Sequence, residues 1–177
     1  MTRRPNWLLF IGLAAAVVVA DQATKALVTS ALQPGESRPI LGDLLRIVFS
    51  QNSGALFGLF KDNAAMFGLV SLGVIGLIVA YHGRAGGSTF MTVTLGLLLG
   101  GAIGNMLDRL RLGYVVDFVD GGIGTVRWYT FNVADAAISL AILLLIVAAL
   151  RPSLVEPIGR EAPTPAPPRQ AAPDGER

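Results

Sequence analysis

Several kinds of residue are absent or scarce in this 177-residue chain, beginning with cysteine, of which it has none. Without cysteine there are no disulfides, thiolate nucleophiles or cysteine-ligated metal sites. The single histidine, His82, argues against a histidine-based metal centre or a serine–histidine pair. Since it lies in the polar stretch 82–88, we predict that His82 is a solvated loop residue. We expect neither a metal nor another cofactor.

Charge is also scarce. Charged residues make up 15% of the chain and hydrophobic residues 53%, which is too apolar for an ordinary soluble domain. The net charge of +2 comes without a basic cluster, so we expect no nucleic-acid partner. The composition instead predicts an integral membrane protein.

Long uncharged runs predict four membrane-spanning helices, at about residues 7–28, 64–81, 89–107 and 131–150. The first run has a second interpretation. Arg3 and Arg4 precede an apolar stretch that ends in small residues at Ala20, as in a cleavable signal peptide. In the third run Gly96, Gly100 and Gly104 recur every four residues, a pattern typical of closely packed membrane helices.

The connections between these runs are partly β-like. Residues 44–51 and 114–119 alternate in polarity as strands do, and 125–131 would return as another strand after the glycine-rich turn 121–124. From residue 152 onward the chain is rich in proline and alanine, so we expect a disordered tail over 152–177.

Four spans would bring most of the polar residues to one membrane surface, because the first and third end where the second and fourth begin. On the helices these residues share single faces, for example Asp21 with Lys25, and Asn132 with Asp135. Arg3, Arg4 and Arg151 favour cytoplasmic termini, which would turn the polar surface outward.

Two aspartates stand out as chemical candidates. Asp135 precedes an uncharged stretch over 136–150, and Asp117 alternates with apolar residues on a predicted strand. Ionisable groups at such positions are costly, and two carboxyls that meet would share a proton and could activate water. The alternative is structural: Asp135 could cap its helix, and Asp21 with Lys25 or Asp108 with Arg109 could be ion pairs. Asp120 is predicted to be a solvated turn residue.

Five motifs together resemble the bacterial lipoprotein signal peptidase family, signal peptidase II. They are DQxTK at 21–25, QNSGA at 51–55, GGAxGNxxDR at 100–109, VVDF at 115–118 and FNVADxxI at 131–138. The resemblance covers about residues 7–150 and favours a retained first helix over a cleaved one. Departures at Leu56, 121–124 and Thr130 affect regions outside the two aspartates.

The resemblance implies an all-α membrane protein with four transmembrane helices and a small extracytoplasmic β-rich platform. Its membrane peptidase domain would span 1–151, with extracytoplasmic loops at 29–60 and 110–130. It would be a monomeric aspartic endopeptidase of the bacterial inner membrane, cleaving prolipoprotein signal peptides before a diacylglyceryl-modified cysteine. Asp117 and Asp135 would be catalytic. The supporting residues would be Asp21, Lys25, Asn52, Asn105, Arg109 and Asn132.

Two functions of other classes remain open from the residues. A small transporter or channel could use buried aspartates as a proton or cation path, although the other halves of the spans are apolar. A membrane scaffold would explain the glycines, yet not two carboxylates at one depth.

Overall fold

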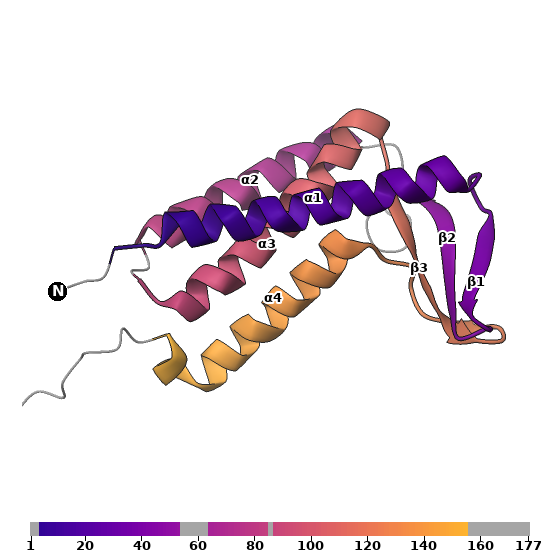
Figure 1. The fold of residues 1–177 in the computed structure, drawn as a ribbon. Coiled ribbons are helices and arrows are strands. Elements are labelled where there is room, and N and C mark those ends of the chain that lie inside the picture. Colours follow the sequence, from indigo (N-terminus) through magenta and orange to yellow (C-terminus); the bar gives the residue numbers. More distant parts are fainter. Residues whose placement is uncertain (1–3, 54–63, 85–86, 156–177) are drawn as a thin grey trace, which may run out of the picture.

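The helices lie side by side along the long axis of the molecule, and a small sheet crosses one end of them (Figure 1). The computed structural model describes residues 4–53, 64–84 and 87–155. Its helices are α1 (Trp7–Ala31), α2 (Ala64–Arg84), α3 (Thr89–Leu112), α4 (Val133–Leu150) and the short 3-10 helix η2 (Pro152–Leu154). Its strands are β1 (Ser37–Leu41), β2 (Leu45–Asn52), β3 (Val115–Ile123) and β4 (Val126–Arg127). Of the tail predicted to be disordered over 152–177, residues 152–154 form η2 instead, and residues 156–177 lie outside the described residues.

Helices α1, α3 and α4 are each long and apolar enough to cross a membrane. In α2 the side chains are described only from Gly68, and Gly68–Arg84 is a shorter apolar helix. Large apolar side chains on the bundle face outward, among them Leu8, Leu77 and Leu150. Such a surface needs lipid around it, so the chain is a membrane protein. Whether α2 is a fourth span stays a prediction.

Helix α1 continues without a break past Ala20, the end of the alternative signal peptide. Its Asp21 and Lys25 are buried against the rest of the bundle. Asn6 caps its first turn through a 3.0 Å bond from the Leu9 amide. The segment is therefore an integral helix of the fold.

The predicted glycine pattern lies where α3 passes between α1 and α4. A methyl group on Gly100 would come within 2.6 Å of Val17 Cβ on α1. Gly101, next to this pattern, faces α4, and a methyl group on it would come within 2.5 Å of the Ala134 carbonyl oxygen. These contacts hold the start of α4 close to α3, and so position Asp135.

The sheet is antiparallel in the order β1-β2-β3-β4. Strand β2 follows the prediction closely, but β3 continues through Ile123, past the start of the predicted turn, and β4 is only two residues long. Beyond β4, the Trp128 amide donates to the Gly121 carbonyl of β3, and Phe131 forms an isolated bridge to Val119. The sequence did not predict β1, because every residue in it is exposed and the strand contains Pro39.

The sequence predicted that His82 is a solvated loop residue, and this prediction is wrong. Helix α2 runs on to Arg84, and this places the His82 side chain inside the bundle with 1% of its surface exposed. Its ring stacks on Phe10 at 4.0 Å between centroids and meets Trp7 edge-on. These contacts join α1 to α2 at the end away from the sheet.

Asp120 is also not a free turn residue. It lies within β3, and its Oδ2 accepts a 2.7 Å bond from Arg127 on the neighbouring strand. The longer β3 explains the difference, because the residues expected to turn are paired instead.

Candidate active site

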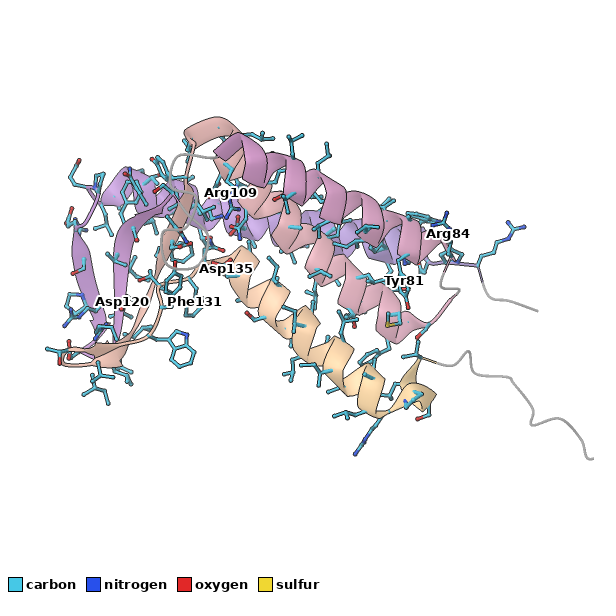
Figure 2. All side chains as sticks on the ribbon, turned by 180° about the vertical axis from the view of Figure 1, so that it is seen from behind. Tyr81, Arg84, Arg109, Asp120, Phe131 and Asp135 are labelled. Atoms are coloured by element: carbon cyan, nitrogen blue, oxygen red, sulfur yellow. The ribbon has the colours of Figure 1, made fainter. Side chains whose placement is uncertain are left out.

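The candidate residues gather where the helix ends meet the sheet. In Figure 2, Asp135 and Arg109 lie at the sheet end of the bundle, and Tyr81 and Arg84 lie at the opposite end. Strand β3 provides Asp117, and the first turn of α4 provides Asp135. The structure thus brings together residues that are far apart in the sequence and that lie on different helices and strands.

Asp117 is almost completely enclosed, with 2% of its surface exposed. Asn52 Nδ2 donates to one carboxyl oxygen at 2.9 Å, and Asn132 Nδ2 donates to the other at 2.7 Å. Burial raises the pKa of Asp117 to about 6, and the negative charge of Asp135 adds to this, although both asparagine bonds and Lys25 oppose it. Asp117 is therefore easier to protonate than an ordinary aspartate.

Asp135 is half-buried and makes two kinds of contact. Its Oδ2 accepts a bond from the backbone of Asn132, while the Asp135 amide donates to Asn132 Oδ1 at 2.9 Å. This reciprocal capping box starts α4. Its Oδ1 accepts a 2.8 Å bond from Asn105 Nδ2 on α3. The capping role considered from the sequence is real, and it also fixes where the carboxylate points.

Two asparagines connect the aspartates. Asn132 is fully buried, and its Nδ2 lies 2.7 Å from Asp117 and 3.2 Å from Asn105 Oδ1. Asn105 in turn donates to Asp135. The path Asp117, Asn132, Asn105, Asp135 therefore joins β3 to α4 through side-chain amides alone.

Beneath this path lies a buried cluster around Lys25. Its ammonium group is 2.8 Å from Asp21, 2.9 Å from Asp108 and 3.1 Å from Asn105 Oδ1. The Asp21–Lys25 ion pair considered from the sequence is present in the structure. The sequence also suggested that Asp108 pairs with Arg109. The partner that the structure gives Asp108 is Lys25, because α1 and α3 face each other here.

The two carboxylates of this cluster also reach the backbone beside each candidate catalytic residue. Asp108 Oδ2 accepts a 3.0 Å bond from the amide of Val116, which precedes Asp117. Asp21 Oδ1 accepts a 2.9 Å bond from the amide of Ala134, which precedes Asp135. One lysine thus fixes two carboxylates, and each of these holds the backbone next to one of the aspartates.

Arg109 and Asn52 border the pair. Arg109 is half-buried on α3, donates to the Asn105 carbonyl at 3.1 Å, and has its charge within reach of Asp135 and Asp117. Asn52, at the end of β2, also lies 3.3 Å from the Tyr129 hydroxyl. The other residues of the motif around Asn52 from position 54 onward lie outside the described part of the chain.

Sequence reasoning missed two participants. Gln22 Nε2 donates to Asp108 at 2.9 Å, and its position inside the motif at 21–25 was an available signal. Tyr129 approaches the site from the loop after β4, and nothing in its sequence context indicated this. Among the described residues, no group of three or more histidine, cysteine, aspartate or glutamate side chains could hold a metal ion.

Comparison with known proteins gives three kinds of match. A family model described as signal peptidase (SPase) II matches residues 13–151. A lipoprotein signal peptidase of Geobacillus kaustophilus is 45% identical over 136 residues, covering 76% of this chain and 88% of that protein. One of Halothermothrix orenii is 37% identical over 131 residues, covering 74% and 88%. A solved structure described as a bacterial membrane enzyme superposes with a TM-score of 0.80 at 29% identity, covering 92% of this chain and 99% of its own.

Proposed function

Because the chain belongs to the signal peptidase II family, we propose that Asp117 and Asp135 are the catalytic pair with which it removes signal peptides from prolipoproteins. The observation that carries this proposal is the convergence of two carboxyl groups, from β3 and α4, linked by Asn132 and Asn105. The chain is thus an aspartic peptidase that acts at the membrane.

The chemistry follows from the different surroundings of the two carboxyls. Asp135 takes a proton from a water molecule, whose oxygen attacks the scissile carbonyl carbon. Asp117, with its raised pKa, donates its proton to the carbonyl oxygen. When the tetrahedral intermediate collapses, the C–N bond breaks and the leaving amine takes the proton held by Asp135, while a hydroxyl of the intermediate returns its proton to Asp117. The reaction needs no covalent intermediate.

The supporting residues divide into two roles in this proposal. Asn105 and Asn132 orient the two carboxyls, and the Lys25 cluster holds the backbone beside them. Asn52 and Arg109 lie at the border of the pair, where they would bind the substrate backbone or the lipid-bearing cysteine. The signal helix and lipid anchor would be held at constant depth by the bilayer, which reduces the entropy cost of positioning the peptide bond.

The membrane arrangement is part of the same proposal. Both ends of the described chain lie at the end of the bundle opposite the sheet (Figure 1). With α2 as a fourth span, residues 1–151 form the peptidase domain of a monomer in the bacterial inner membrane. Both termini and the 152–177 tail are then cytoplasmic, and the site opens near the extracytoplasmic face.

A proton or cation path is not favoured. The buried carboxylates near Asp135 do not continue along the described part of the bundle, whose other half is packed around Phe10, Leu95 and Leu99. The buried hydroxyls there, of Thr92 and Thr94, donate to carbonyls of their own helix. A transported ion would have to cross this half of the bundle without a carboxylate to bind it.

The test is cleavage by the purified full-length chain of a prolipoprotein precursor, with and without the diacylglyceryl group on its cysteine. We expect cleavage directly before the lipidated cysteine, read by mass spectrometry, and little cleavage of the unlipidated precursor. Equal cleavage of both forms would contradict the proposed substrate class. Proteoliposomes made from the same preparation should show no proton flux.

A further inference from the structure

One end of the sheet carries an exposed apolar surface that the peptidase reaction does not use. We call it the apolar tip, and its residues are Ile40, Leu41, Leu44, Ile123, Val126 and Trp128. Val126 is 79% exposed and Trp128 is 75% exposed. A hollow of about 530 Å³ lies within it, lined in part by Leu44, Ile123 and Trp128. Exposed apolar side chains gathered around a hollow in this way indicate an interaction site.

The apolar tip is one surface, built from two turns that are tied together. The turns at Gly42 and Gly124, both with positive φ, lie at the same end of the sheet because Leu45 pairs with Gly121. The Asp43 side chain accepts a bond from the Gly124 amide, and the Asp43 carbonyl accepts one from Arg127. The two turns, and the exposed side chains beside them, are therefore held together at this end of the sheet.

The position of the apolar tip favours lipid as its partner. In both views the sheet crosses the helix ends, and its turns project past the start of α4 (Figures 1 and 2). The chain passes from β4 at Arg127 to the cap of α4 at Asn132, a reach of at most about 18 Å. The lipid-facing surface of α4, with Leu140 and Leu143 exposed, begins close by. The tip and the exposed face of α4 are therefore joined by a short stretch of chain, which keeps the tip near the membrane boundary.

The chemistry of the apolar tip agrees with this position. Trp128 and Tyr129 are the residue types that concentrate at the membrane–water boundary. The cationic side chains beside them are already paired: Arg127 with Asp120 and Asp43, and Arg46 with Asp43. Binding would therefore depend on burial of apolar surface, at about 25 cal/mol per Å², and little on headgroup charge.

We propose that the apolar tip inserts into the membrane leaflet next to the start of α4 and anchors the sheet there. Tyr129 follows Trp128 directly, and its hydroxyl lies 3.3 Å from Asn52, which donates to Asp117. An inserted tip therefore sets the depth of the Asp117 side of the site relative to the lipid. The inference rests on the membrane character of the chain and stands apart from the identity of the catalytic residues.

Tryptophan fluorescence tests the proposal, since Trp7 and Trp128 are the only tryptophans. The full-length Trp7→Phe variant, reconstituted in phosphatidylcholine vesicles, has Trp128 as its sole reporter. We expect blue-shifted emission that is strongly quenched by lipids brominated near the glycerol end of the acyl chain. Adding phosphatidylglycerol should change the quenching little. Trp128 quenched freely by aqueous iodide and not by brominated lipid would overturn the proposal.

A second variant tests whether the tip side chains act together. In the Trp7→Phe background, Ile123→Ser with Val126→Ser should shift Trp128 emission to the red and reduce its quenching by brominated lipid. Circular dichroism in the same vesicles checks that the helices persist. The matched control carries the same two serines and Trp128→Phe but keeps Trp7. Trp7 then reports the other end of the bundle, and its emission and quenching should not differ from those of Trp128→Phe alone. Unchanged Trp128 quenching in the serine variant would also overturn the proposal.

Discussion

Asp117 combines burial with two amide donors that oppose the effect of burial. Its enclosure raises the pKa to about 6, while the hydrogen bonds from Asn52 and Asn132 act in the opposite direction. The balance keeps its proton exchange close to neutral pH, where a general acid is most effective. Two predictions follow from this balance.

The first concerns the pH profile. Asn52→Ala removes a bond that favours the ionised form, so the pKa of Asp117 should rise further. If protonated Asp117 is the acid, activity falls as pH rises through this pKa. The alkaline limb of kcat/KM should therefore move upward by roughly one pH unit. Asn6→Ala, at the cap of α1 away from the site, is the control. An alkaline limb that stays in place would remove Asp117 from this role.

The second concerns stability. The folded-state pKa of Asp117 is raised from 3.8 to about 6, so ionising it costs more in the folded protein. Wild-type stability therefore decreases as pH rises from about 4 to about 6, relative to a variant that does not titrate. The stability of Asp117→Asn relative to wild type should improve over this range by on the order of 2 kcal/mol. Melting temperatures at pH 4 and pH 8 measure it, and a pH-independent difference would contradict it.

At the scale of elements, Lys25 joins α1 to α3 and, through Asp21 and Asp108, to the backbone of α4 and β3. Lys25→Met would leave two buried carboxylates without their cation. A loss of about 3–5 kcal/mol in unfolding free energy is expected. Arg38→Met, which breaks an exposed 3.1 Å pair with Glu36, should change the unfolding free energy far less, because water screens that pair. Equal effects of the two substitutions would mean that the buried cluster does not stabilise the fold.

The contact between α3 and α4 depends on Gly101, beside the Ala134 carbonyl. Gly101→Ala must push the two helices apart and should cost about 1–3 kcal/mol, with reduced activity because Asp135 moves. Gly73→Ala on α2 adds a methyl group where no atom lies within 4 Å. It should leave both the melting temperature and activity close to wild type. The prediction is wrong if the two alanine variants behave alike.

Elements with long uncharged stretches were predictable, and elements defined by pairing were not. Apolar length gave the start of α3 and nearly the whole of α4, although α3 continues past the predicted end at residue 107 to Leu112. By contrast, β1 has no alternation and exists because it pairs with β2. His82 was misplaced because its polarity suggested a helix end, while its ring is buried between the aromatic residues of α1.

For the candidate site, the residue types alone did not separate a catalytic role for Asp117 and Asp135 from a structural one. Asp135 shows why, because its carboxylate also caps α4. The motifs predicted the family, which the comparisons confirm. The grouping of Lys25 with Asp108 could not be predicted, because it depends on which faces of α1 and α3 meet.

At the scale of the whole molecule, the two ends of the bundle differ in chemistry. One half is packed with apolar and aromatic side chains around Phe10, and the other holds the buried carboxylates, amides and Lys25 beneath the sheet. Lipid around the helices would hold a signal helix parallel to them, with its cleavage site at the polar end. Fold and membrane together would therefore bring one peptide bond to one pair of aspartates.

The most direct test of this account is the cleavage rate of a lipidated prolipoprotein by purified Asp117→Asn and Asp135→Asn, compared with Asp120→Asn. Asp120 lies on the same strand as Asp117, and its carboxylate forms an ion pair with Arg127, outside the proposed catalytic pair. Each of the first two variants should lose activity by roughly a hundred- to ten-thousandfold while remaining folded. The third should retain most of its activity. Near wild-type cleavage by either Asp117→Asn or Asp135→Asn would contradict the account.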